Sequence, residues 1–166
     1  MAQASSFDVT TGVDLQEVDN AINQARKEVA QRYDFKDAKV EIDFKRAEGL
    51  IALSADHDMR MRSLFDVVQA KLIKRGVPVK NLDIGAVIPA GGDTLRREIK
   101  LKQALDSDTA KKIAAAIKEQ KFKKVQAAIM GEQVRVSSAS KDELQAVVAY
   151  LRAQDFGVAL QFGNYR

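Results

Sequence analysis

The chain has 166 residues, of which 46% are hydrophobic and 30% are charged, and this composition is typical of a soluble globular protein. It contains no cysteine, which excludes disulfides, thiolate catalysis and cysteine-based zinc sites. No apolar run is long enough to span a membrane, and residues 1–10 lack the basic start and apolar core of a secretory signal, so we expect a cytoplasmic protein.

Residues 1–88 predict the order strand, helix, strand, strand, helix, strand. Apolar residues recur at helical spacing in two segments, and they alternate with polar residues in the strands. Gly49 lies in the turn of the expected hairpin, and Gly76 is the expected stop of the second helix. The expected elements are strands at 6–9 (an edge strand), 39–44, 50–54 and 82–88, and helices that begin at Asp14 and after Ser54 or Asp56.

Residues 94–166 repeat the same order after a segment rich in proline and glycine. This segment, residues 89–93, reads Pro-Ala-Gly-Gly-Asp, which predicts a linker; an ordinary surface loop is the alternative. Ser140 and Glu143 have the spacing of a capping box at the start of the last helix. The expected elements are strands at 95–102, 125–129, 134–136 and 158–162, and helices that begin at 106 and 140.

The patterns predict an α+β fold with two ferredoxin-like domains. Each sheet has apolar side chains on one face only, so two helices are expected to cover that face and leave the other open. We predict a duplication of a βαββαβ unit, with antiparallel sheets, in residues 1–92 and 93–166. Residues 1–92 hold 13 Lys/Arg and 14 Asp/Glu, whereas residues 93–166 hold 14 and 9, so the net charge of +4 lies wholly in the second part. That asymmetry favours an anionic partner.

No catalytic or metal-binding motif accompanies this pattern. The sequence contains neither a Walker A motif nor a dinucleotide-binding glycine motif, and its one histidine, His57, is interpreted as a solvated loop residue. We therefore predict a protein that is not an enzyme and that holds no cofactor and no metal ion.

Cations on the expected open face of the second sheet are the candidate phosphate-binding residues. Alternation of buried and exposed positions places Arg96, Lys100 and Lys102 on that face, and Arg135 on a neighbouring strand is expected to join them. Ordinary solvated surface charge is the alternative. No aromatic residue lies near them on this face, so base stacking of the kind seen in RNA-recognition motifs is not expected. Further candidates, which lie near the expected helix ends of the first domain, are Arg32, Lys36 and Arg75.

Several stretches resemble the YajQ family of bacterial cytosolic proteins, almost from end to end. The stretches are Ser6-Phe7-Asp8, residues 13–18, Arg32-Tyr33-Asp34-Phe35-Lys36, Lys71-Leu72 with Lys74-Arg75-Gly76, residues 100–103, residues 131–136, Lys141-Asp142 with 144–147, and Phe162 to the end. The resemblance implies two RNP-like domains in tandem and a nucleotide-binding protein without established catalysis. Some members act as cyclic di-GMP effectors through a transcription regulator. In such duplicated folds the first strand, within residues 1–13, can also cross to the other domain.

Three functions are therefore open. The first is a cyclic di-GMP effector, whose ligand offers two phosphates to a group of cations and two guanine faces to a ring or an arginine plane. The second is an RNA-binding protein that uses a basic sheet face. The third is a small interaction domain that binds neither ligand.

Overall fold

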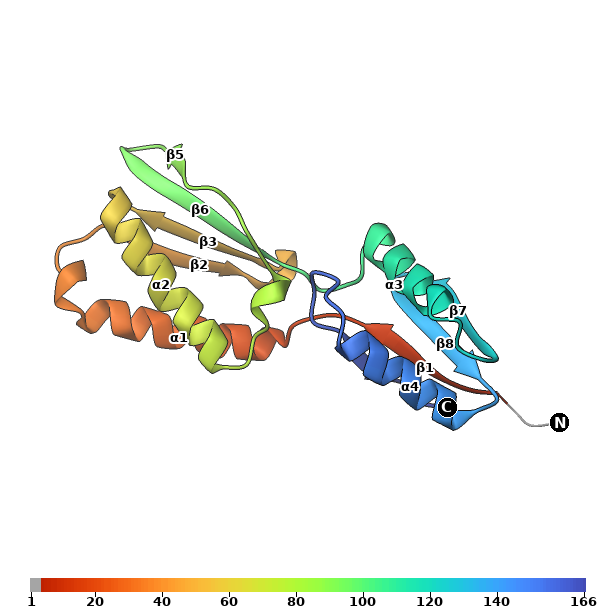
Figure 1. Ribbon diagram of the computed structural model, residues 1–166. Coiled ribbons are helices and arrows are strands. Elements are labelled where there is room, and N and C mark those ends of the chain that lie inside the picture. Colours follow the sequence, from red (N-terminus) through yellow and green to blue (C-terminus); the bar gives the residue numbers. More distant parts are fainter. Residues whose placement is uncertain (1–3) are drawn as a thin grey trace. The chain divides into compact units, whose positions relative to one another are not determined.

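The computed structural model describes residues 4–166 and divides the chain into two compact units (Figure 1). Unit 1 comprises the chain up to Gly12 together with Gln103–Arg166, and unit 2 comprises Val13–Lys102. The described residues form four α-helices and two sheets, and all strand pairings between them are antiparallel. This confirms the predicted ferredoxin-like α+β class.

Unit 1 contains one strand from the start of the chain and the elements that follow residue 103. In chain order they are β1 (Ser5–Thr10), α3 (Ser107–Glu119), β7 (Val125–Met130), β8 (Gln133–Ser138), α4 (Lys141–Arg152) and β9 (Gln161–Gly163). The sheet order is β7-β8-β1-β9, in which β1 lies between β8 and β9. This is the βαββαβ arrangement, with unit 2 inserted between its first strand and its first helix.

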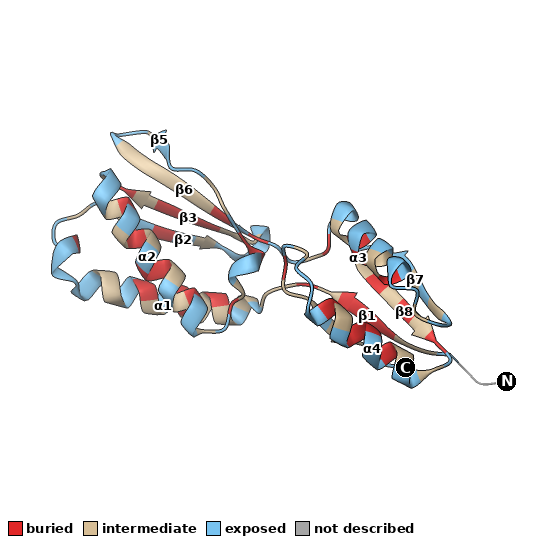
Figure 2. Ribbon diagram, in the orientation of Figure 1, coloured by how far each residue is buried: buried red, intermediate tan, exposed pale blue. Residues whose placement is uncertain are grey.

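The core of unit 1 lies between its sheet and its two helices (Figure 2). Alternate residues of β1 and β8 point to this side, and Phe7, Val9, Val134 and Val136 are fully buried there. The helices contribute apolar positions three and four residues apart. These helix residues are Ala110, Ile113 and Ile117 of α3 and Leu144, Val147, Val148 and Leu151 of α4.

Unit 2 contains the other two α-helices and a second sheet. Its elements are α1 (Leu15–Gln31), β2 (Glu41–Lys45), β3 (Leu50–Ala55), α2 (Asp58–Lys74), β4 (Leu82–Ile84), β5 (Ile88–Ala90) and β6 (Thr94–Leu101). Three short 3-10 helices lie at Tyr33–Phe35, Arg46–Glu48 and Val79–Asn81. The sheet order is β2-β3-β6-β4, and β5 also pairs with β6. The last strand, β6, therefore takes the inner position that β1 has in unit 1.

The domain boundary predicted at residues 92 and 93 is wrong. The strand expected at residues 95–102 was assigned to the second sheet, but β6 pairs along its length with β3, from Leu50↔Lys100 to Ala55↔Leu95. Residues 89–93 are consequently no linker: Ala90 pairs with Thr94, so the segment closes a hairpin between β5 and β6. The alternative, a surface loop, fits only residues 91–93, because Pro89 and Ala90 belong to β5.

The charge asymmetry disappears with the corrected boundary. Unit 2 holds 17 Lys/Arg and 15 Asp/Glu, a net charge of +2. Unit 1 holds 10 Lys/Arg and 8 Asp/Glu, which is also +2. The excess assigned to residues 93–166 came from β6, whose cations belong to unit 2. Net charge therefore gives no reason to prefer either unit as the site of an anionic ligand.

Two smaller expectations also need correction. Residues 6–9 were expected to form an edge strand, but β1 is an inner strand, and Phe7, Asp8 and Val9 are buried in succession because partners flank it on both sides. The cap of α2 is neither Ser54 nor Asp56 but His57, whose side chain accepts a hydrogen bond from the Arg60 amide. The predicted caps of α1 and α4 agree with the structure.

Candidate functional site

The four predicted sheet cations belong to two different sheets. Arg96 and Lys100 lie on β6, and Lys102 directly follows it, so all three belong to unit 2. Arg135 lies on β8 of unit 1. The predicted single face that carries all four cations is therefore wrong, because β6 and β8 share no sheet.

The open face of the unit 2 sheet carries both signs of charge. Residues that pair directly across strands share a face, and Arg96 pairs with Ser54, which pairs with Glu41. Glu98 lies on the same face and accepts a hydrogen bond from Arg96 at 3.2 Å. A cavity beside Lys100 is lined by Asp83 and Glu98 as well. These carboxylates oppose the binding of phosphate.

Arg135 is bound to a buried carboxylate on the open face of the unit 1 sheet. Its Nε donates to Asp8 Oδ1 at 3.0 Å, and Asp8 has only 3% of its surface exposed. Asn164 and Gln133 also donate to Asp8. The hydrogen bond from Arg135 holds the pKa of the Asp8 carboxyl below its ordinary value, although burial acts in the opposite direction. Arg135 is thus neutralised within the fold.

The remaining predicted cations lie around the helix ends of unit 2, and two of them also have carboxylate partners. Arg32 donates twice to Asp34, at 2.9 and 2.8 Å. Arg75 donates twice to Glu17, at 2.7 and 3.1 Å. Lys36 lies 6.0 Å from the ring centroid of Tyr33. These arginines serve local structure, since each is already paired in bidentate geometry.

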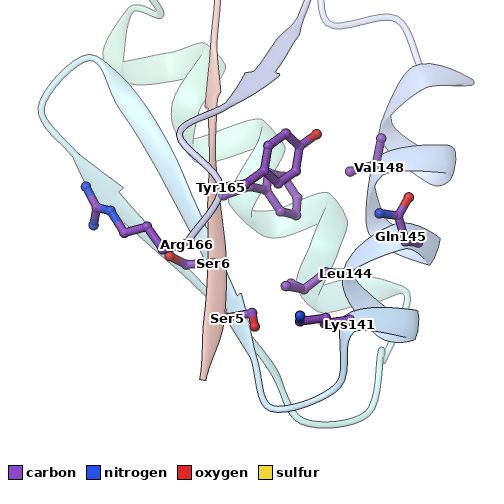
Figure 3. Close-up of a pocket in the computed structure, with 9 residues that line it drawn as sticks. Ser5, Ser6, Lys141, Leu144, Gln145, Val148, Tyr165 and Arg166 are labelled. Atoms are coloured by element: carbon purple, nitrogen blue, oxygen red, sulfur yellow. The ribbon is translucent and has the colours of Figure 1, made fainter. Parts of the chain in front are cut away.

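A pocket of about 290 Å³ in unit 1 has a different character (Figure 3). It lies between β1, the first turns of α4 and the residues that follow β9. Unlike the cavity beside Lys100, it has no carboxylate side chain in its lining. The lining residues are Ser5, Ser6, Phe7, Lys141, Leu144, Gln145, Val148, Tyr165 and Arg166.

An aromatic ring and a cation both line this pocket. Tyr165 is 60% exposed, and its ring centroid lies 6.0 Å from that of the buried Phe7, which supports it from behind. Lys141, the first residue of α4, extends toward the β1 side, whereas the Arg166 side chain points away from α4 (Figure 3). Lys141 has no ion pair with any residue from 4 to 166, and is therefore available to an anion.

Hydrogen bonds hold the residues of this pocket in place. Arg166 and Ser6 exchange both backbone hydrogen bonds, at 3.0 and 3.2 Å, which fixes Tyr165 beside β1. The α4 end is fixed by Ser140, whose hydroxyl accepts from the Glu143 amide at 3.3 Å, as the capping-box spacing predicts. A ring and a cation on fixed backbone can stack a nucleobase and pair with a phosphate, and the apolar side chains of α4 complete the wall.

The sequence analysis did not select this pocket as the site, although it contained a usable signal. Three stretches on which the family resemblance rests meet here: Ser6-Phe7-Asp8, residues 141–147, and residues 162–166. Charge alternation drew attention to β6 instead. The pairing of residues 5–10 with β8 and β9 was needed to bring the two ends of the chain together.

Residues 4–166 contain no cluster of three His, Cys, Asp or Glu side chains of the kind that a metal site would require. None of the helices described there has both the length and the apolar character needed to cross a bilayer.

The fold and the pocket define a small α+β protein with ferredoxin-like units and a ligand-sized cavity. Comparison with known proteins then identifies its family. Residues 5–166 match the family model described as "Nucleotide-binding protein YajQ-like". A "Nucleotide-binding protein" of Chloroherpeton thalassium is 45% identical over the full length of both chains. Proteins with the same description from Desulfitobacterium hafniense and Bacillus cereus are 47% and 46% identical, again over both full lengths. The chain therefore belongs to the YajQ-like family, as the sequence resemblance predicted.

Proposed function

We propose that this chain is a non-catalytic nucleotide-binding protein whose ligand is a purine nucleotide of the cyclic di-GMP class. The observation that carries the proposal is the unit 1 pocket, which is lined by both the ring of Tyr165, supported by Phe7, and the unpaired cation of Lys141. The names of the relatives agree with nucleotide binding, and none of the three reported names describes an enzyme. We further propose that the bound state acts through a protein partner, such as a transcription regulator.

The size of the pocket limits how such a ligand binds. Ligand pockets commonly measure about 300–1,000 Å³, and this one, at about 290 Å³, is at the lower end. It therefore suits one nucleotide unit. A cyclic dinucleotide is proposed to insert one guanine against Tyr165 and to place the nearer phosphate at Lys141, with its second half outside the pocket.

Replacing Lys141 with Glu is expected to weaken cyclic di-GMP binding by about tenfold or more, because a charge-assisted hydrogen bond is lost and a repulsive charge is introduced. Isothermal titration calorimetry measures the change. Lys112→Glu, an exposed substitution on α3 with the same change in charge, is the control and should bind like the native protein. If both variants bind equally, Lys141 is not the phosphate contact.

Replacing Tyr165 with Ala is expected to weaken binding by about 5- to 160-fold, since base stacking contributes about 1–3 kcal/mol per ring. Tyr165→Phe keeps the ring and should retain most of the affinity. Equal losses in the two variants would show that the hydroxyl, and not the ring, matters. The competing placement on β6 is tested with Lys100→Glu, which should leave the affinity unchanged.

RNA binding, the alternative predicted from the sequence, no longer has the charge asymmetry that suggested it. It stays a prediction with a direct test, because binding through phosphates weakens steeply as salt rises. We expect the affinity for a short single-stranded RNA to be weaker than that for the nucleotide. Tight RNA binding with a steep salt dependence, unaffected by Lys141→Glu, would favour the RNA alternative.

A further inference from the structure

The outer edge of β7 is available for strand pairing. In the sheet order β7-β8-β1-β9, β7 pairs with β8 on one side, and no strand within residues 4–166 pairs with its other side. The six residues Val125–Met130 include no charged side chain, and Ile129 and Met130 are each 45% exposed. Edge strands are usually protected by charges, proline or covering elements, because their unpaired backbone groups can bind another strand. Within β7 there is neither a charged residue nor a proline that would protect its outer edge.

A groove runs beside this edge, between α3 and β7. It has a volume of about 500 Å³ and is lined by small and apolar side chains together with Gln126 and one cation, Lys118. Ala114 and Ala115 leave space on the helix side, and Val125 and Ala127 line the strand side. A strand added to β7 would direct alternate side chains into this groove and leave the others on the opposite face.

Lysines surround the groove. Residues 110–131 contain six lysines and a single carboxylate, Glu119. Lys111 and Lys118 lie seven residues apart on α3, on the same helix face as the groove-lining alanines. Lys121, Lys123 and Lys124 are exposed in the connection that leads into β7. An extended segment beside β7 would lie close to Lys118 and to the lysines that precede the strand.

We propose that β7 is a docking edge for an extended peptide of a partner protein whose groove-facing side chains, at every second residue, are apolar except for an acidic one. The unpaired edge supplies backbone hydrogen bonds, the small and apolar part of the groove accepts the apolar side chains, and Lys118, which lines the groove, attracts the acidic one. A second copy of this chain fits less well, because antiparallel pairing of two β7 strands about a two-fold axis would bring the lysine faces of two α3 helices together. The proposal is independent of the nucleotide pocket.

Three synthetic peptides test this docking edge on the full chain. The first, the Val/Glu peptide, has seven residues with Thr at its even positions and Val, Glu, Val and Val at its odd positions; the second has Lys in place of Glu, and the third is the Val/Glu peptide with Pro at its centre. Backbone amide shifts and hydrogen exchange of residues 125–130 are followed by NMR. We expect the Val/Glu peptide to shift these amides and slow their exchange, and the other two to bind at least tenfold more weakly.

A pair of charge-reversal variants completes the test. Lys118→Glu should weaken binding of the Val/Glu peptide by about tenfold, whereas Lys112→Glu, on another face of α3, should leave it unchanged. Equal binding of the acidic and proline-containing peptides would overturn strand addition. A single-stranded RNA that shifts the β7 amides while the Val/Glu peptide does not, or sedimentation that shows a dimer paired through β7, would overturn the proposed partner.

Discussion

Replacing Arg135 with Met is expected to lower the free energy of unfolding by about 2–3 kcal/mol at neutral pH, because it leaves a buried carboxylate without its cation. Asp8 is 3% exposed at the centre of the unit 1 sheet, and Arg135 donates to it at 3.0 Å. Asn164 and Gln133 would still donate to Asp8. Neutral donors compensate a buried charge only in part, so the loss should be clear in urea denaturation.

The loss should depend on pH in a defined direction. Because the pKa of Asp8 is lowered in the folded state, chiefly by the hydrogen bond from Arg135, its carboxylate stabilises the fold above its unfolded pKa of about 3.9. That contribution disappears as the pH falls through the lower folded pKa. The difference between native protein and variant should thus be largest near pH 7 and should shrink below about pH 4.

A double variant separates the charge effect from packing. Asp8→Asn combined with Arg135→Met removes both charges and should recover part of the stability lost in the single variant. A loss below about 0.5 kcal/mol in Arg135→Met, or a loss that is independent of pH, would contradict the assignment of Arg135 as the partner of Asp8.

Replacing Ile99 with Ala is expected to cost unit 2 about 3 kcal/mol, the range for a large aliphatic side chain removed from a packed core. Ile99 is fully buried and belongs to the same core cluster as Ile51, its pairing partner on β3. Ile73→Ala is the matched control: Ile73 is 53% exposed on α2, so its replacement should change stability by less than about 0.5 kcal/mol.

The location of the effect distinguishes the two domain boundaries. With Lys102 as the end of unit 2, Ile99→Ala should accelerate hydrogen exchange of the β3 amides, because β6 is their sheet neighbour. Faster exchange in β8, with β3 unaffected, would instead support a boundary at residue 92.

Local features of the fold were predictable from the sequence because short-range patterns determine them. The caps at Asp14 and Ser140, the hairpin near Gly49 and the helix stop at Gly76 all depend on neighbouring residues, and the structure contains each of them. Which of the two sheets a strand joins was not predictable in this way. A strand at residues 94–101 alternates identically whether it pairs with β3 or with a strand of the other sheet, so its pattern carries no information about its partner.

The candidate site shows the same limit. Alternation correctly placed Arg96, Glu98 and Lys100 on one face of a strand, but it did not reveal that Glu98 accepts a hydrogen bond from Arg96. Arg135 was expected to be available, but its carboxylate partner, Asp8, is 127 residues away in the chain. Lys141 and Tyr165 come together only through β1, so pairing between the two ends of the chain had to be known first.

The most direct test of the unit 1 pocket as the nucleotide site is an NMR titration of the full chain with cyclic di-GMP. The largest backbone amide changes should fall in residues 5–7, 141–148 and 164–166, which line the pocket or lie beside it. Changes confined to residues 94–101, or the absence of any change at saturating nucleotide, would contradict this placement.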